Sequence, residues 1–290
     1  MSAMNRLSLA ALFVVAVMLL AGCGGSDESP AAEPEAAQQQ APAAAPGPPG
    51  SKPLPQVQEL EAAVEQNPDD YRTRHLLAMA LHRSGQRDAA LEHFVKVAEQ
   101  APEIIYKIEL GNAYASLNRM EEAEKAFQVA LQDDPSNSTV LYHLGNLAQR
   151  RNATDEAISL YRQAIQSDAQ HMLSHFQLAE SLRLSGQLRE AYRSYEAVVG
   201  LEPQNPNEVR AFDGALFGLA TLDLQHGETE RGVEFLQVLV ESVPNHPQAH
   251  LLLGQALGQL GRQEEAQAEL AIHQQLTGGG TAAPGGASAP

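Results

Sequence analysis

The histidines are the residues in this sequence with the most obvious capacity for chemistry. Ten occur in 290 residues. Two pairs, His171/His175 and His246/His250, have the i, i+4 spacing that can place two side chains on one helical face. The first member of each pair falls in a turn before its helix, and no third ligand lies at a suitable spacing for zinc. We therefore predict no metal site, and metal binding through these pairs stays the weakest alternative function.

Motifs of known catalytic sites are missing from the sequence. It contains no G-x-S-x-G, no Walker loop, no H-E-x-x-H and no glycine-rich dinucleotide fingerprint. The net charge of −17 opposes binding to nucleic-acid phosphates, and no basic run offsets it. We predict a non-catalytic protein that needs no cofactor and does not bind nucleic acid.

The single cysteine, Cys23, follows an N-terminal targeting segment. Arg6 precedes an apolar run over residues 7–20, which is short for a membrane span and typical of a signal peptide. The run ends in Leu-Ala-Gly-Cys, which resembles the lipobox of bacterial lipoproteins. That resemblance implies removal of residues 1–22 and lipidation of Cys23. The alternative is an ordinary signal peptide or signal anchor that contains a cysteine.

Residues 23–55 begin with Cys23 and continue as a linker rich in Pro, Ala and Gln. Such a composition offers little that can pack and predicts a disordered chain. Gly24 and Gly25 follow the cysteine, and in enterobacterial lipoproteins the absence of Asp there implies sorting to the outer membrane. We predict a lipid-anchored protein of the bacterial envelope that faces the periplasm, on the outer membrane rather than the inner.

A repeated helix–turn–helix pattern organises the rest of the chain. Between Ile104 and Pro135, two sets of residues each share a helical face: Leu110, Gly111 and Tyr114, then Ala123, Phe127 and Ala130. Asn118 suits the turn between the two helices, because Asn tolerates the left-handed conformation. The leading leucine recurs at positions 77, 110, 144, 178, 219 and 253, with spacings of 33, 34, 34, 41 and 34 residues.

The pattern resembles the tetratricopeptide repeat, a helix pair of 34 residues. The resemblance implies an all-α fold, a right-handed superhelical solenoid of helix–turn–helix repeats. We expect a capping helix at 56–67, six repeats at 71–103, 104–137, 138–171, 172–205, 213–246 and 247–276, and a disordered tail at 277–290. Seven extra residues, 206–212, start with the capping signals Asn205, Pro206 and Glu208, so they predict a longer helix rather than a loop.

The resemblance also implies a concave groove lined by the first helix of each pair. Its candidate partner-binding residues are Arg72, His75, Met79, Arg83, Ile108, Asn112, Tyr142, Asn146, Arg150, Phe176, Arg183 and Phe217. Arginines could bind the carboxylates of an extended peptide, asparagines its backbone and aromatic rings its apolar side chains. The alternative is that these are ordinary solvated helix positions.

We therefore predict a scaffold or adaptor that captures a segment of a protein or peptide partner during envelope assembly. An alternative is a structural lipoprotein that self-assembles into a homo-oligomer through its last repeat. Leu270, Ile272 and Leu276 lie in that repeat, and no polar capping helix follows to cover them.

Overall fold

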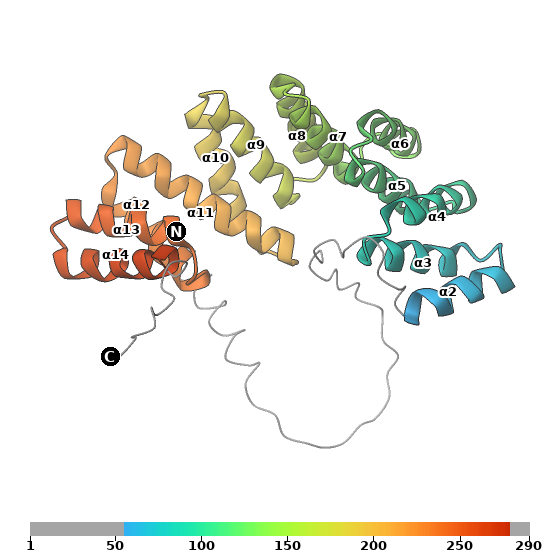
Figure 1. Ribbon diagram of the computed structural model, residues 1–290. Coiled ribbons are helices and arrows are strands. Elements are labelled where there is room, and N and C mark those ends of the chain that lie inside the picture. Colours follow the sequence, from blue (N-terminus) through green and yellow to red (C-terminus); the bar gives the residue numbers. More distant parts are fainter. Residues whose placement is uncertain (1–54, 279–290) are drawn as a thin grey trace, which may run out of the picture. The chain divides into compact units, whose positions relative to one another are not determined.

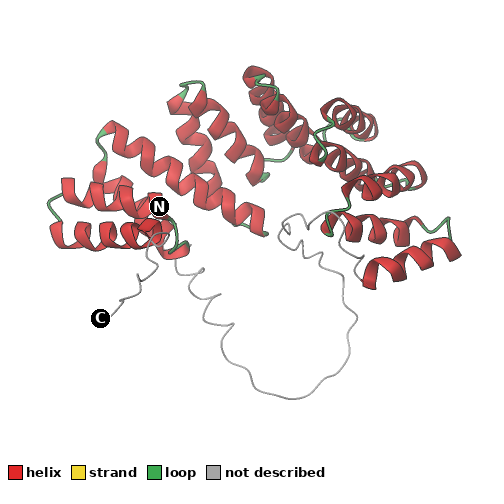
Figure 2. Ribbon diagram, in the orientation of Figure 1, coloured by secondary structure: helices red, strands yellow, loops and turns green. Residues whose placement is uncertain are grey.

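The computed structural model describes residues 55–278, which form helices and no strands (Figure 2). The predicted signal peptide, Cys23, most of the linker and the end of the tail lie outside the described residues. None of the described helices is both long and apolar enough to span a membrane.

The helices of the described chain fall into two compact units, which meet in the sequence at 186/187. The N-terminal unit contains α2 (Pro55–Gln66), α3 (Tyr71–Arg83), α4 (Arg87–Gln100), α5 (Ile104–Ser116), α6 (Met120–Asp133), α7 (Ser138–Arg150), α8 (Thr154–Ser167) and α9 (Met172–Leu184). The C-terminal unit contains α10 (Leu188–Val199), α11 (Pro206–His226), α12 (Thr229–Ser242), α13 (Pro247–Gln259) and α14 (Gln263–Gly278).

Within the N-terminal unit, successive helices pack as α3/α4, α5/α6 and α7/α8 pairs (Figure 1). Each first helix also contacts the second helix of the pair before it, and α5 contacts α7, as α7 contacts α9. Helices α3, α5, α7 and α9 therefore follow one another along one layer of this unit. Helix α2 covers the open side of α3 with Val57 and Val64, which are buried.

Within the C-terminal unit, α10 packs on α11, and the α11/α12 and α13/α14 pairs contact each other through α12 and α13. Helix α11 is longer than its equivalents, at 21 residues (Figure 1). It begins at Pro206, and the Asn205 side chain accepts hydrogen bonds from the backbone N–H groups of Asn207 and Glu208. The capping signals therefore mark the start of an extended helix, as predicted.

Close packing inside the α5/α6 and α7/α8 pairs depends on glycine facing an aromatic ring. A Cβ on Gly111 would lie 2.4 Å from Cε1 of Phe127, and one on Gly145 would lie equally close to Tyr161. Both rings are almost fully buried. The two glycines thus leave the room that the rings of α6 and α8 occupy.

The last helix, α14, has an incompletely covered apolar face. Only Ala266 is buried in it, whereas Leu270, Ile272 and Leu276 are half-buried. No further helix follows among the described residues.

Candidate interaction face

Helices α3, α5, α7 and α9 carry eleven of the twelve residues predicted to bind a partner. The twelfth, Phe217, lies on α11 in the C-terminal unit. We call the layer of α3, α5, α7 and α9 the first-helix face. Its helices are held side by side by polar contacts, and these contacts decide which side chains remain accessible.

The α3 end of this face carries an exposed stripe, and Leu184 at the end of α9 is also exposed. Arg72, Leu76, Met79 and Arg83 follow the i, i+4, i+7, i+11 spacing of a single helical stripe. Both arginines are exposed, Leu76 is 53% exposed and Met79 is half-buried. The only hydrogen bond between Arg83 and the described chain runs from its Nε to the Met79 carbonyl, at 3.3 Å, so most of its donors remain available.

Helix α5 continues the exposed surface. Ile105 at its start is 46% exposed, and Asn112 is exposed two turns later. We call Arg72, Leu76, Met79 and Arg83, together with Ile105 at the start of the second repeat, the first-repeat strip. It combines large apolar side chains with two arginines.

His75 lies between α3 and α5 and ties the two helices together. Its ring meets the edge of Tyr106 with 5.0 Å between centroids. Its Nε2 lies 2.5 Å from Oε2 of Glu109, close enough for an ion pair when the imidazole is protonated, although the two groups are not aligned as a hydrogen bond. The predicted binding residue His75 is therefore used in packing α3 against α5.

Asn112 and Asn146 both contact neighbouring side chains. Asn112 Nδ2 lies 3.5 Å from His143 Nε2, and the His143 ring stacks on Phe127 with 5.2 Å between centroids. Burial lowers the pKa of His143 to about 4, helped by the nearby His171. Asn146 Oδ1 accepts a hydrogen bond from the Tyr161 hydroxyl at 2.8 Å, so the NH2 group is what Asn146 can present to a ligand.

Two of the arginines predicted to bind a partner already bind other groups of this protein. Arg150 donates to the carbonyl of Ala115 at 3.1 Å and to Oδ1 of Asn118 at 3.2 Å. It therefore satisfies the carboxyl end of α5, whose last carbonyls lack helical partners. Arg183 is paired with Glu180 on its own helix at 2.8 Å.

Ile108 is a core residue, so its prediction as a groove residue is wrong. It is only 5% exposed and belongs to a cluster with Phe127, Val140, Leu144 and Leu147. Helix α7 stacks on α5 at this point and covers the side chain.

The predicted aromatic contact residues are half-buried. The Tyr142 ring lies 5.2 Å from the ring of His143 and 5.3 Å from that of His171. Phe176 is also half-buried. Phe217 stacks on His246 at 5.3 Å with 24° between the planes. These rings present an edge or part of one face at the surface.

The histidine pairs have structural roles. His171 and His246 accept backbone N–H groups at the starts of α9 and α13, and His175 donates to the Ala169 carbonyl at 3.0 Å. His250 is buried between Oε2 of Glu269, at 2.6 Å, and the Pro244 carbonyl, at 2.9 Å. Residues 55–278 contain no group of three or more potential metal ligands.

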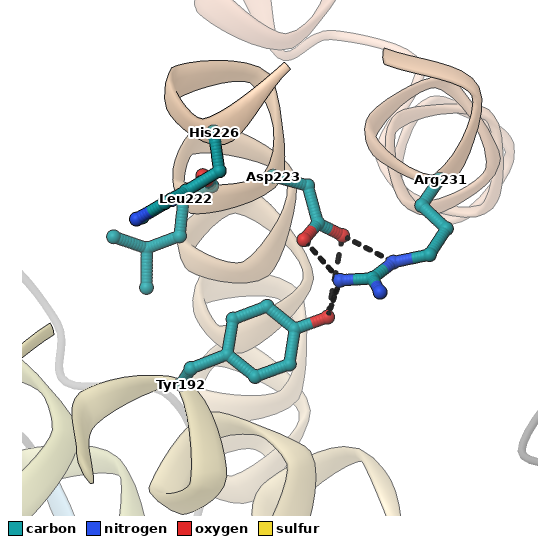
Figure 3. Close-up of polar contacts among 5 residues, drawn as sticks. All are labelled: Tyr192, Leu222, Asp223, His226 and Arg231. Carbon is teal, nitrogen blue, oxygen red and sulfur yellow. Dashed lines mark hydrogen bonds and ion pairs between the residues drawn. The ribbon is translucent and has the colours of Figure 1, made fainter. Parts of the chain in front are cut away.

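A buried polar network in the C-terminal unit was missed by the sequence prediction. Asp223 on α11 is 2% exposed; it accepts a hydrogen bond from Tyr192 of α10 at 3.2 Å and pairs with Arg231 of α12 (Figure 3). Nη2 of Arg231 also donates to the Tyr192 hydroxyl at 2.7 Å. Burial raises the pKa of Tyr192 to about 12, and the charge of Asp223 adds to this.

A sequence signal for the network does exist. At the register of Asp223, other repeats carry Leu81, Leu182 and Leu257, so a carboxylate there breaks the apolar pattern. Because a buried carboxylate needs compensating partners, this Asp predicts a cation nearby. The network joins α10, α11 and α12, and so fixes the long helix within its unit.

Comparison with known families identifies the repeats. Profiles described as tetratricopeptide repeat match residues 50–104, 108–171, 142–206 and 217–280. The chain belongs to the tetratricopeptide repeat family. Proteins of this family are generally non-catalytic scaffolds that bind protein or peptide partners, and the matches cover both units.

Solved structures agree on the fold. MamA from Desulfovibrio magneticus RS-1 is similar with a TM-score of 0.52 and 16% identity, over 63% of this chain and 99% of that one. The Cut9–Hcn1 hetero-tetramer of APC/C is similar with a TM-score of 0.57 and 12% identity, over 77% of this chain and 44% of that one. Pseudomonas aeruginosa pilF is similar with a TM-score of 0.50 and 21% identity, over 68% of this chain and 80% of that one. No curated protein sequence matches the chain. At these identities the structures support an all-α solenoid of tetratricopeptide repeats and nothing more specific.

Proposed function

We propose that this protein is a lipid-anchored adaptor that captures an acidic, partly apolar segment of a protein partner on its first-repeat strip. The observation that carries the proposal is Leu76, 53% exposed on the same stripe of α3 as the exposed Arg72 and Arg83, with Ile105, 46% exposed, at the start of α5. Large exposed apolar side chains that lie together are typical of interaction sites.

Charge favours an acidic segment at this strip. The whole chain has a net charge of −17, yet the first repeat, residues 71–103, contains five Arg or Lys against four Asp or Glu. Arginine binds carboxylates through two parallel N–H donors, a geometry that lysine cannot offer. The first repeat therefore escapes the strong excess of acids found in the rest of the chain.

The spacing along α3 defines the length of the captured segment. Arg72 and Arg83 are eleven residues apart, which corresponds to about 16 Å along a helix. Leu76 and Met79 lie between them. The matching partner segment carries carboxylates near both ends and apolar side chains in the middle.

The remaining first helices contribute less to recognition in this proposal. Arg150 and Arg183 already bind groups of this protein, and Ile108 is buried. The NH2 group of Asn146 and the edges of Tyr142 and Phe176 remain as secondary contacts along the same face. Recognition is thus concentrated at α3 and α5.

The membrane part of the proposal rests on the sequence around Cys23. Lipidation of this residue would anchor the protein in the bacterial envelope, on the periplasmic side of the outer membrane, with residues 24–54 as a tether. Envelope assembly is the process in which such an adaptor would act. Replacing Cys23 with alanine should move the protein from the membrane to the soluble fraction, and an unchanged distribution would contradict the anchor.

Site-specific photo-crosslinking in membranes tests the capture. One variant carries the photoreactive residue at Leu76, and the matched control carries it at Val129, which is 45% exposed on α6. We expect one dominant partner from position 76 and none from position 129. Equal yields at both positions, or a partner seen only at 129, would contradict capture by the first-repeat strip.

A second candidate function is self-assembly through α14, favoured by its half-buried Leu270, Ile272 and Leu276. A homo-oligomer built on this face would lose its assembly when Leu276 is replaced by glutamate. Sedimentation of the full chain over a range of concentrations measures this. A monomeric wild-type protein at all concentrations would eliminate the candidate.

A further inference from the structure

The tether, residues 24–54, carries a cluster of carboxylates. It contains four acids and a single base, Lys52. The acids are Asp27, Glu28, Glu33 and Glu35. All four lie within residues 27–35, which we call the acidic tether segment, and no acid occurs in the rest of the tether. The charge of the tether is therefore concentrated in one short stretch near its beginning.

The spacing of these carboxylates corresponds to that of the arginines on the first-repeat strip. The prolines of the acidic tether segment favour a polyproline-like chain, which has three residues per turn and rises about 3.1 Å per residue. In such a chain Asp27, Pro30 and Glu33 share one face, and the two acids are about 19 Å apart. Arg72 and Arg83 are about 16 Å apart along α3, and the long stems of arginine side chains accommodate the difference.

The apolar groups of the two surfaces correspond as well. Pro30 lies midway between the two acids that share its face. Leu76 and Met79 lie between the two arginines of α3, where Leu76 is 53% exposed and Met79 is half-buried. An apolar ring flanked by carboxylates thus matches an apolar surface flanked by guanidinium groups. This is the same chemistry that we propose for a partner segment.

The acidic tether segment can reach the strip from the point where the tether joins the folded chain. Helix α2 begins at Pro55 and packs on α3 (Figure 1). Pro55 lies 20 residues after Glu35, and a chain of this length spans about 25 Å on average. Helix α3, with 13 residues, is only about 20 Å long. Because both surfaces belong to one molecule, their effective concentration is of millimolar order, so weak contacts suffice.

We propose that the acidic tether segment occupies the first-repeat strip of its own molecule whenever no partner is bound there. This inference rests on the proposed function, because it uses the same arginines and apolar side chains. A partner must then displace the segment, and its apparent affinity falls in proportion to the fraction of molecules whose strip is free. The tether therefore excludes partners that bind the strip only weakly.

Photo-crosslinking within the purified full chain tests this occupancy without any partner. The photoreactive residue is placed at Leu76, and the control carries it at Val129 on α6; mass spectrometry maps the joined peptides. We expect a product of monomer mass that joins position 76 to residues 27–35, and no such product from position 129. The yield should be independent of protein concentration and should fall in about 0.5 M salt, which screens surface charges.

Two variants of equal net charge separate the acidic tether segment from general electrostatics. The first neutralises its four carboxylates: Asp27→Asn, Glu28→Gln, Glu33→Gln and Glu35→Gln. The second neutralises four exposed glutamates of α12 and α14: Glu230→Gln, Glu234→Gln, Glu241→Gln and Glu264→Gln. We expect the crosslink to be lost in the first variant and retained in the second. Equal yields in the two variants, products of dimer mass alone, or no crosslink to residues 27–35 in the wild type would overturn the inference.

Failure of this inference and failure of the proposed function give different results. A partner captured in membranes, with no internal crosslink in the purified chain, would overturn the occupancy and leave capture intact. An internal crosslink with no partner in membranes would support the occupancy and contradict capture. Where both contacts exist, neutralising the four tether carboxylates should raise the partner yield at position 76, and an unchanged yield would overturn the competition.

Discussion

Replacing Gly111 with alanine tests the close packing on which the repeats depend. The added Cβ would lie 2.4 Å from Cε1 of Phe127, whereas carbon atoms in contact prefer about 3.5–4.0 Å. The ring must move by more than ~1 Å in a core where it is almost fully buried, and such overpacking costs about 1–3 kcal/mol. Alanine recovers about 1 kcal/mol of helix propensity. We expect a net loss of up to about 2 kcal/mol in the α5/α6 pair.

Gly258→Ala is the matched control for this change. It also adds a Cβ inside a first helix, but the nearest atom is Cβ of Ala266, at an ordinary 3.9 Å. We expect this variant to be more stable than the wild type by about 0.5–1 kcal/mol. The two variants therefore have opposite signs despite identical chemistry.

Native-state hydrogen exchange is the suitable assay, because repeats of an array open separately and a single melting curve averages over them. Amides of α5 and α6 report on Gly111→Ala, and those of α13 and α14 report on Gly258→Ala. Adding Phe127→Leu to Gly111→Ala should relieve the clash and make the two effects non-additive. Stabilisation by Gly111→Ala of the size seen for Gly258→Ala would refute the packing argument.

Three further predictions concern ionisable groups. The pKa of His143 is lowered to about 4 in the folded protein, so on acidification the unfolded chain binds the proton first and stability falls as pH drops from about 6.5 to 4. His143→Phe keeps the stack on Phe127 and should flatten this part of the stability profile measured by urea denaturation. An unchanged profile would contradict the assignment. The pKa of Tyr192 is raised to about 12, so the folded protein keeps its proton longer and stability falls between about pH 10 and 12. Burial also raises the pKa of Tyr161, so ultraviolet titration should show more than one late-ionising tyrosine, and Tyr192→Phe should remove one of them. Arg231→Ala leaves Asp223 buried without its cation and should destabilise α11 and α12 by about 2 kcal/mol. This cost is smaller than that of breaking a fully buried ion pair, because Arg231 is exposed. Arg231→Lys should recover part of the loss, and equal amide hydrogen-exchange rates in all three proteins would argue against the network.

The fold could be predicted from the sequence because its determinants are local and repeated. Residues of similar type recur at the positions of Leu110, Gly111 and Phe127 in the other repeats. Each helix pair therefore supports the assignment of the next pair. The turn residues Asn118 and Asn152 have φ of 62°, as their role at the end of a first helix requires. Periodicity alone therefore specifies which residues face the core.

The site could be predicted only in part, because accessibility depends on contacts between repeats. Ile108 has the register of a groove residue, but α7 covers it. Arg150 has the register of a residue that could bind a partner's carboxylate, but its guanidinium donates hydrogen bonds to the carboxyl end of α5. Asp223 could not be found from the repeat pattern, because that pattern is defined by positions where the repeats carry the same type of residue, and Asp223 stands where other repeats carry leucine. Contacts between neighbouring helices thus decide which of the aligned positions can recognise a partner.

The central claim is that the arginines of the first-repeat strip recognise an acidic partner segment. The most direct measurement is the crosslinking yield at Leu76 in the double variant Arg72→Glu/Arg83→Glu, compared with Arg189→Glu/Arg193→Glu. The control reverses two exposed arginines on α10 and has the same net charge. We predict loss of the partner in the first variant and full yield in the second. Equal yields in the two variants would contradict recognition by the first-repeat strip.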